Sequence, residues 1–277
     1  MTLQQALLQG TKLLGDAGIA APRLTAEVLL GHALGQERPF LYAHSERELR
    51  EVEWIHFGRY LHERLNGKPT QYITGCQEFY GREFRVTPDV LIPRPETELV
   101  VETALMVGRG ARRIVDAGCG SGAIAVTLQL ETGALVSGTD ISAAALTVAA
   151  ENAWKLGAKV DWVRCDLISA IASASMDMVV SNPPYVPLGD RAGLQREVRD
   201  YEPDVALIAG PTGFEIYERL VADAARVLRP GGWLVLELGY TSKDRVTAML
   251  GANWRDVRVA PDLASMPRVL TARIVGE

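Results

Sequence analysis

The stretch 114–122, which reads IVDAGCGSG, carries the strongest fold signal in this 277-residue chain. Its apolar β-branched residues predict a short buried strand, and the glycines that follow predict a tight turn into a helix. Glycine lets the backbone adopt positive φ and approach a ligand closely. The helix after it points unpaired N–H groups at that ligand. A strand, a glycine-rich turn and a helix in this order indicate a nucleotide-binding α/β fold.

Strand and helix patterns alternate on the C-terminal side of this turn. Helical patterns cover, for example, 143–155 and 214–228, between runs of apolar and β-branched residues. Such alternation predicts a parallel sheet with helices on both faces. Runs over 257–260 and 269–275 flank a proline-containing turn without a helix between them, so we expect an antiparallel hairpin there. The other expected strands fall at 114–115, 135–136, 160–163, 178–180 and 233–238.

The first 75 residues show helical spacing of apolar residues and no strand-like alternation. Residues 78–95 instead place aromatic and β-branched residues among glycines and prolines, which predicts a short hairpin and a stiff connector. We therefore expect a small all-helical domain over 1–75, a β-hairpin and linker over 76–95, and an α/β domain over 96–277. The apolar stripes of the helical domain comprise Leu3, Ala6, Leu7, Leu13, Leu14, Ala26, Leu29, Leu30, Ala33, Leu34, Val52, Ile55, Tyr60 and Leu61.

Composition and charge narrow the class of protein. The chain has 29 basic and 34 acidic residues, and its net charge of -5 gives no bulk attraction to nucleic acid. The cysteines Cys76, Cys119 and Cys165 are widely spaced and form no CxxC pair, so we expect neither a disulfide framework nor a zinc site, and a reducing cytoplasm fits. We expect no leader peptide. No apolar run approaches the roughly 18 residues that span a membrane.

Two acidic residues follow the next two expected strands. Asp140 ends the strand after the glycine loop, at about the distance where an acid holds a ribose diol, and Asp166 ends the strand after that. An adenosine without phosphates presents hydroxyls and an exocyclic amine, all of which can donate to carboxylates. Turn-forming or helix-capping roles for both acids stay open. We interpret Cys119 as a small residue that fills the tight loop, in preference to a nucleophile.

The tetrapeptide Asn182-Pro183-Pro184-Tyr185 follows another expected strand, at the carboxyl edge where open α/β folds bind ligands. An amide or aromatic amine nitrogen is a poor nucleophile because its lone pair is delocalised. The Asn182 side-chain carbonyl and the Pro183 backbone carbonyl can each accept one N–H of such an NH2 group, and proline adds no competing donor. Two fixed acceptors stabilise the positive charge that develops as the nitrogen is alkylated, and Tyr185 can pack on the planar group. These residues predict methylation of a planar nitrogen by a sulfonium donor, with a simple proline-rich turn as the competing interpretation.

Two other function classes stay open on the residues alone. An adenine-N6 methyltransferase acting on DNA or RNA would use the same tetrapeptide. It would also need a basic surface and usually a target-recognition domain to extrude the base, and this acidic chain has neither in evident form. A dehydrogenase or a non-catalytic binding protein on a Rossmann-like sheet would share the glycine loop and Asp140. A comparison of S-adenosylmethionine binding with NAD binding would distinguish a methyltransferase from a dehydrogenase or a non-catalytic binding protein.

Several further strings match one known family. They are Gly67-Lys68-Pro69, QYITG over 71–75, EFYG over 78–81, LIPRPETE over 91–98, and Glu237-Leu238-Gly239. With these strings and the tetrapeptide, nearly the whole chain resembles the release factor glutamine methyltransferases, the HemK/PrmC family. The octapeptide over 91–98 is far more specific than either the glycine loop or the tetrapeptide.

The resemblance implies a helical substrate-recognition domain and a class I, Rossmann-like methyltransferase domain with a seven-stranded, mostly parallel sheet. It implies methyl transfer from S-adenosyl-L-methionine, with S-adenosyl-L-homocysteine as product and no metal. The acceptor would be the side-chain nitrogen of the glutamine in the GGQ motif of class 1 peptide chain release factors, with no direct nucleic-acid binding and no membrane. The implied cofactor residues are Gly118, Cys119, Gly120, Ser121, Gly122, Asp140, Asp166, Leu167 and Asn182. The implied substrate residues are Asn182, Pro183, Pro184 and Tyr185, of which Asn182, Pro183 and Tyr185 are expected to be catalytic.

Overall fold

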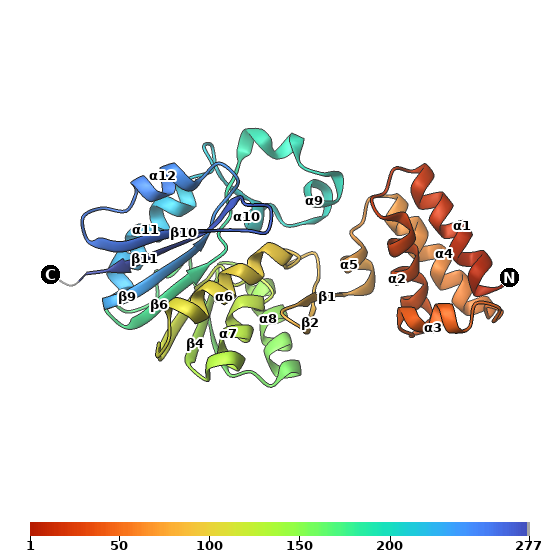
Figure 1. Cartoon of the computed structure of the whole chain (residues 1–277), viewed down its shortest axis with the longest axis horizontal. Helices are drawn as coiled ribbons and strands as arrows, with labels where there is room; N and C mark the ends of the chain where they lie inside the picture. The colour runs from red at the N-terminus through yellow and green to blue at the C-terminus, as the bar shows by residue number, and fades with distance from the viewer. Residues whose placement is uncertain (276–277) are drawn as a thin grey trace. The chain divides into compact units, whose positions relative to one another are not determined.

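The chain divides into two compact units in a computed structural model that describes residues 1–275 (Figure 1). The first unit comprises Met1–Cys76 together with the short segment Gln195–Tyr201. The second unit comprises Gln77–Leu194 and the residues from Glu202 onward. The chain therefore leaves the second unit after Leu194, contributes one short segment to the first, and returns at Glu202.

The first unit is all-helical. Its first helix begins with a capping box, in which Thr2 and Gln5 satisfy each other's backbone N–H groups. The core contains most residues of the predicted apolar stripes, and Leu3, Ala6, Leu14, Leu29 and Leu30 are almost fully buried. The helices are α1 (Leu3–Asp16), α2 (Pro22–Leu34), α3 (Arg38–Ala43), α4 (Glu51–Leu65), α5 (Thr70–Thr74) and α9 (Arg196–Tyr201).

The predicted stripe on α4 is wrong in part. Val52 and Ile55 are 49% and 58% exposed, whereas Phe57 is fully buried. The buried face also carries Glu53, whose carboxylate accepts hydrogen bonds from Arg47 and Arg50. A charged residue can occupy the buried face because its partners satisfy it. Apolar spacing alone therefore misassigns the orientation of this helix.

Helix α9 packs within the first unit although it is distant in sequence. Arg64 lies within 2.5 Å of Glu197 and is only 9% exposed along its side chain, and the Tyr201 hydroxyl donates to the Asn66 carbonyl at 3.2 Å. Gly67 has a φ of 101°, and a Cβ there would stand 3.0 Å from the Arg196 side chain. The sequence pattern contained no indication of this packing.

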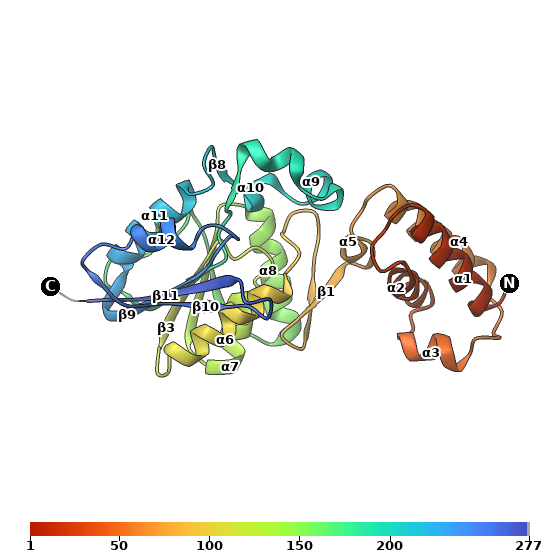
Figure 2. The same cartoon turned by 45° about the horizontal axis from the view of Figure 1, so that its top comes forward.

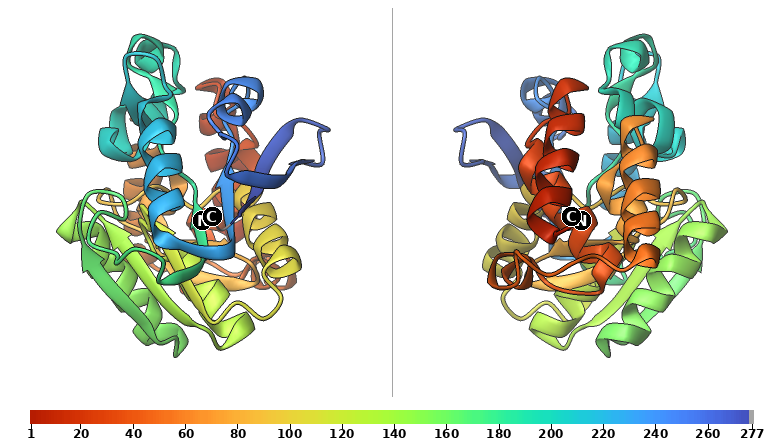
Figure 3. Two further views of the ribbon diagram at one scale, coloured as in Figure 1. Left: turned by 90° about the vertical axis from the view of Figure 1, so that its left-hand side faces the viewer. Right: turned by 90° about the vertical axis from the view of Figure 1, so that its right-hand side faces the viewer.

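The second unit is built on a seven-stranded sheet, which confirms the predicted fold class. Its strands lie in the order β10-β11-β9-β6-β3-β4-β5. The five strands from β9 to β5 are parallel to one another, and β11 pairs antiparallel with both β9 and β10. The terminal antiparallel hairpin is therefore also confirmed, and Figure 3 shows it extending from the sheet. The strands are β3 (Arg113–Ala117), β4 (Leu135–Asp140), β5 (Val160–Arg164), β6 (Met176–Ser181), β9 (Leu228–Glu237), β10 (Trp254–Pro261) and β11 (Pro267–Ile274).

Helices cover both faces of this sheet (Figure 2). Alternate residues of each strand point to opposite faces, so Val115, Val179 and Leu234 join one apolar cluster while Ile114 and Met178 join the other. Helix α11 packs in the first cluster, and α6 and α7 pack in the second. The helical elements are α6 (Glu98–Val107), α7 (Ala123–Thr132), α8 (Ala143–Leu156), α10 (Asp204–Leu207), α11 (Glu215–Val227) and α12 (Lys243–Ala248), with short 3₁₀ turns η1 (Pro95–Thr97) and η2 (Leu188–Gly193).

The hairpin that precedes the sheet belongs to this core. It consists of β1 (Cys76–Phe79) and β2 (Arg82–Arg85), and a second small pair is formed by β7 (Val186–Pro187) and β8 (Ile208–Gly210). Phe79 and Phe84 are fully buried in the cluster with α6 and α7, with their rings edge to face at a centroid distance of 6.0 Å. The hairpin is thus anchored by its aromatic residues.

None of the helices within residues 1–275 combines the length and the apolar character that a membrane span requires.

The ion pair between the buried Arg64 and the partly exposed Glu197 of α9 gives a prediction about stability. Arg64→Met removes the guanidinium that holds Glu197, so we expect the free energy of unfolding of the helical unit to fall by about 1–3 kcal/mol. Arg59→Met is the matched control, because Arg59 is 59% exposed and lies 3.8 Å from Glu63. Its effect should stay below about 0.5 kcal/mol. Chemical denaturation measures both variants. Equal stability of the two would contradict a structural role for the Arg64 contact.

Candidate active site

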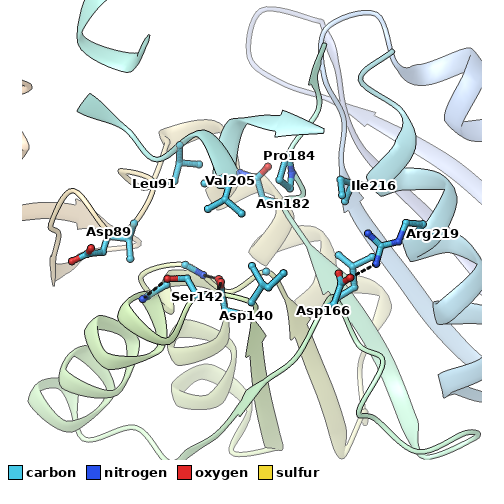
Figure 4. Close-up of a pocket in the computed structure, with 17 residues that line it drawn as sticks. Asp89, Leu91, Asp140, Ser142, Asp166, Asn182, Pro184, Val205, Ile216 and Arg219 are labelled. Atoms are coloured by element: carbon cyan, nitrogen blue, oxygen red, sulfur yellow. Dashed lines mark hydrogen bonds and ion pairs between the residues drawn. The ribbon is translucent and has the colours of Figure 1, made fainter. Parts of the chain in front are cut away.

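A cleft opens at the carboxyl edge of the sheet. Strands β3 and β6 are adjacent and parallel, while β4 and β5 continue on one side and β9 on the other. The order of strands reverses at this point, which is where open α/β sheets bind ligands. The cleft has a volume of about 200 Å³ and is lined from the ends of β3, β4, β5 and β6, from α11, and from the loop before η1 (Figure 4).

The glycine loop contributes two of its five residues to this cleft. Gly118 and Gly120 line it and have φ values of 70° and 52°. Gly122 has a different role, since a Cβ there would stand 3.0 Å from Trp162 and 3.1 Å from Ala149. Ser121 is buried, and its carbonyl accepts from the Asn152 amide at 2.9 Å. The end of the loop therefore serves packing, and its beginning faces the cleft.

Asp140 lies in the cleft and also holds the loop in place. One of its carboxylate oxygens accepts from the Gly120 backbone N–H at 2.9 Å, and the other accepts from Ser142 at 2.8 Å. Each carboxylate oxygen has two lone pairs, so these bonds leave acceptor capacity for a ligand. The Asp140 side chain can therefore stabilise the turn and bind a ligand at the same time.

Asp166 lines the cleft in an ion pair that the sequence did not indicate. Its carboxylate lies 2.5 Å from the Arg219 guanidinium of α11, and both side chains are half exposed (Figure 4). Arg219 is 53 positions away, so no local pattern could have identified it. Leu167 also lines the cleft and holds a φ of 48°, an uncommon conformation for a non-glycine residue.

Cys119 lies beside the cleft without lining it. Its side chain is 7% exposed, and a Cβ added to Gly138 would stand 3.3 Å from its sulfur. Burial raises the pKa of the Cys119 thiol well above its usual value, and the nearby acids Asp116 and Asp140 raise it further. A protonated, buried thiol is a poor nucleophile, which favours the interpretation of this residue as a small filler.

Asp116 is a buried acid that sequence reasoning missed. It lies one residue before the end of β3, is 1% exposed, and accepts a hydrogen bond from the Ala125 backbone N–H at 3.0 Å. Burial raises its pKa to about 7, opposed by that hydrogen bond. The contact ties the end of β3 to the first turn of α7 and so fixes the glycine loop between them.

The tetrapeptide after β6 is split between two environments. Asn182 and Pro184 line the cleft, whereas Pro183 is buried outside it. Tyr185 is partly buried against the apolar cluster of α11, and a Cβ on Gly239 would stand 2.9 Å from its ring. Burial raises the pKa of Tyr185 to about 12. The structure therefore brings Asn182 together with Gly118, Gly120 and Asp140, and it places Pro183 and Tyr185 outside this cleft.

The Asn182 side chain is part of a buried chain of polar groups. Its amide nitrogen donates to the Thr97 hydroxyl oxygen at 3.0 Å, and the Thr97 hydroxyl donates to the Glu237 carboxylate at 2.6 Å. Thr97 and Glu237 are 4% and 2% exposed. Both residues lie in strings that carry the family resemblance, over 91–98 and 237–239, but the sequence alone indicates no role for either of them. Their contact spans 140 positions, so only the tertiary structure reveals it.

Taken together, the sheet order, the glycine loop and the acid-lined cleft beside Asn182 define a class I methyltransferase fold. Residues 5–75 match the family described as PrmC N-terminal domain, and residues 96–194 match the methyltransferase small domain. The chain is 43% identical to the release factor glutamine methyltransferase of Koribacter versatilis, over 99% of each chain. It is 44% identical to that of Moorella thermoacetica, over 98% of each. This chain therefore belongs to the release factor glutamine methyltransferase family.

A solved structure agrees on the fold of the methyltransferase. A methyltransferase from Pyrococcus furiosus superposes with a TM-score of 0.52 at 15% identity, covering 79% of this chain and 100% of its own. At that level of identity the likeness concerns the fold alone.

Proposed function

We propose that this enzyme methylates the side-chain amide nitrogen of the glutamine in the GGQ motif of class 1 release factors, with S-adenosyl-L-methionine as methyl donor. The observation that supports this most directly is the position of Asn182, which lines the same cleft as Gly118, Gly120 and Asp140. Figure 4 shows Asn182 and Asp140 on opposite sides of it. The family membership supports a release factor glutamine as acceptor, because the relatives are named release factor glutamine methyltransferase.

The cleft has the chemistry that S-adenosyl-L-methionine requires. Asp140 offers acceptor capacity for ribose hydroxyls, and Gly118 and Gly120 leave room for close approach of the backbone. The remaining walls are largely apolar, which suits a planar base. When bound, this donor supplies an electrophilic methyl group on a sulfonium. The apolar lining residues are Val90, Leu91, Ile141, Ala145, Leu167, Pro184, Val205, Ala206 and Ile216.

The residues of this chain act by positioning and electrostatics. The Asn182 side-chain carbonyl accepts one N–H of the substrate NH2, and the Pro183 backbone carbonyl is proposed to accept the other. Both acceptors orient the nitrogen and stabilise the positive charge that it acquires as its lone pair forms the new N–C bond. The alkylated nitrogen is acidic, so its extra proton is lost without a strong base. Alignment of donor and acceptor accounts for much of the rate.

The helical unit is proposed to recognise the release factor. A stable protein interface buries of order 800 Å² per partner, more than one glutamine provides. The helical unit exposes several large apolar side chains that its own core does not use. They are Met1, Leu8, Leu13, Leu24, Tyr42, Val52 and Ile55.

The first test is the reaction itself. Mass spectrometry of a release factor, incubated with enzyme and S-adenosylmethionine, should show a gain of one methylene unit on the GGQ peptide. Asn182→Ala should lower kcat by about 100- to 1,000-fold, by analogy with removal of one preorganised partner. Asn182→Asp keeps the acceptor but loses the amide donor, so we expect an intermediate rate. Absence of the modified peptide, or wild-type turnover by the alanine variant, would contradict the proposal.

The second test concerns the donor site. Asp140→Ala should weaken S-adenosylmethionine binding by about 1.5–3 kcal/mol, the range for a hydrogen bond to a charged group. Asp161→Ala is the control, since Asp161 is an exposed acid on the neighbouring strand β5. Isothermal calorimetry measures both. If a folded Asp140→Ala bound the donor as tightly as the control, Asp140 would not be part of the donor site.

The third test concerns recognition. Val52→Ser combined with Ile55→Ser should raise KM for the intact release factor roughly tenfold, which corresponds to the loss of about 1–2 kcal/mol at an interface. The rate at saturation should hardly change. Trp154→Ser is the control, because Trp154 is 86% exposed on α8 of the other unit. The same KM for all three proteins would remove these two residues from the recognition surface.

A further inference from the structure

We propose that Thr97 and Glu237 are positioning residues that fix which way round the Asn182 side-chain amide lies. This inference deepens the proposed function, and it rests on Asn182 presenting its carbonyl to the substrate nitrogen. The juxtaposition that carries it is the buried chain Asn182–Thr97–Glu237, with N···O and O···O distances of 3.0 and 2.6 Å.

The orientation of an asparagine amide has to be imposed by its neighbours. The carbonyl oxygen and the NH2 group are nearly equal in size and shape, and a half-turn of the side chain exchanges them. With the carbonyl toward the substrate, Asn182 accepts an N–H of the glutamine. With the NH2 toward the substrate, two donors would face each other, and the developing positive charge would meet a positive group. The reaction therefore needs one orientation only.

The hydroxyl of Thr97 supplies the required asymmetry. A hydroxyl has one proton to donate, and an ionised carboxylate can only accept. Because Thr97 donates its proton to Glu237, its oxygen is left to accept, and only the NH2 group of Asn182 can donate to it. The Asn182 carbonyl is thereby directed away from Thr97. Thr97 precedes α6 at a position where threonine commonly caps a helix, yet its hydroxyl makes no capping bond.

Three distant segments meet in this arrangement. Thr97 comes from the string 91–98, Asn182 from the tetrapeptide, and Glu237 from the end of β9. Glu237 is only 2% exposed. A carboxylate in such a place is costly unless it is hydrogen-bonded. If this position served packing alone, an apolar residue would be more stable there. The free-energy cost of burying the Glu237 carboxylate therefore indicates that its role as a hydrogen-bond acceptor has a function.

The protonation state of Glu237 should control the orientation. Burial raises the pKa of Glu237 to about 7, opposed by the hydrogen bond from Thr97. Once protonated, Glu237 can donate to Thr97, and the Thr97 hydroxyl proton becomes free to turn toward the Asn182 carbonyl. Activity should therefore rise as pH increases through about 7. The other titratable and charged groups near Glu237 are Arg268, Glu96, Arg94, Tyr185 and Tyr217.

The test is a set of substitutions at Thr97 measured by single-turnover kinetics. Thr97→Val keeps the shape of the side chain and removes its hydroxyl. We expect methyl transfer to be roughly 10- to 100-fold slower, by analogy with the loss of residues that orient metal ligands by hydrogen bonds. The KM for S-adenosylmethionine should change less than about twofold. Thr97→Ser restores the hydroxyl and should restore most of the rate. Thr103→Val is the matched control, since Thr103 is a buried threonine on α6.

The pH profile separates positioning from a structural effect. The wild type should lose activity below about pH 7, and Glu237→Gln should lose this dependence because glutamine does not titrate. Thr97→Val combined with Glu237→Gln should be no slower than Thr97→Val, since both changes break one chain of contacts. A wild-type rate in Thr97→Val, failure of Thr97→Ser to rescue, or an unchanged pH profile in Glu237→Gln would overturn the proposal.

A substrate-independent measurement keeps this inference distinct from the proposed function. The side-chain NH2 resonances of Asn182 can be assigned by NMR through their loss in Asn182→Ala. Their exchange with solvent should be slower in the wild type than in Thr97→Val, whatever the enzyme methylates. Equal exchange would reject the Thr97 contact, whereas slow exchange without methylation of the release factor would reject the proposed acceptor alone.

Discussion

The parallel pairing of β3 with β6 is the constraint on which the rest of this enzyme depends. The pairing sets Val115 beside Val179 and Asp116 beside Val180. Because both strands run in the same direction, the loops that follow them emerge at the same edge of the sheet. The glycine loop and Asn182 meet there although about 60 residues separate them. The helices on both faces bury the sheet and hold this pairing in register.

The degree of burial determines which reactive side chains of the site can take part in binding or chemistry. Cys119 and Tyr185 are reactive types in principle, but burial raises the pKa of both, so each stays protonated and packs as a largely apolar group. Asp140 stays partly exposed and keeps acceptor capacity in the cleft. A donor that already carries positive charge needs no strong nucleophile or base from the protein. The site accordingly relies on aligned acceptors.

Two buried carboxylates lie near the carboxyl ends of strands β3 and β9. Asp116 accepts from the first turn of α7, and Glu237 accepts from Thr97. For each, burial raises the pKa to about 7. Burying an acid opposes folding when the acid is charged. Asp116 lies one residue before the end of β3, and Glu237 ends β9. Each acid is therefore buried at the carboxyl end of a strand, where its hydrogen bond fixes backbone or side-chain geometry.

The sequence by itself determined the alternating α/β order, the terminal hairpin, the helical N-terminal region and the segments that carry the chemistry, because strand and helix periodicity and turn residues are local properties. It did not determine the orientation of α4, where paired charges such as Glu53 replace apolar residues on the buried face. It also could not pair Arg219 with Asp166, place α9 in the helical unit, or link Thr97 to Glu237. These contacts join positions 53 to 140 residues apart, and only the folded chain brings such positions together.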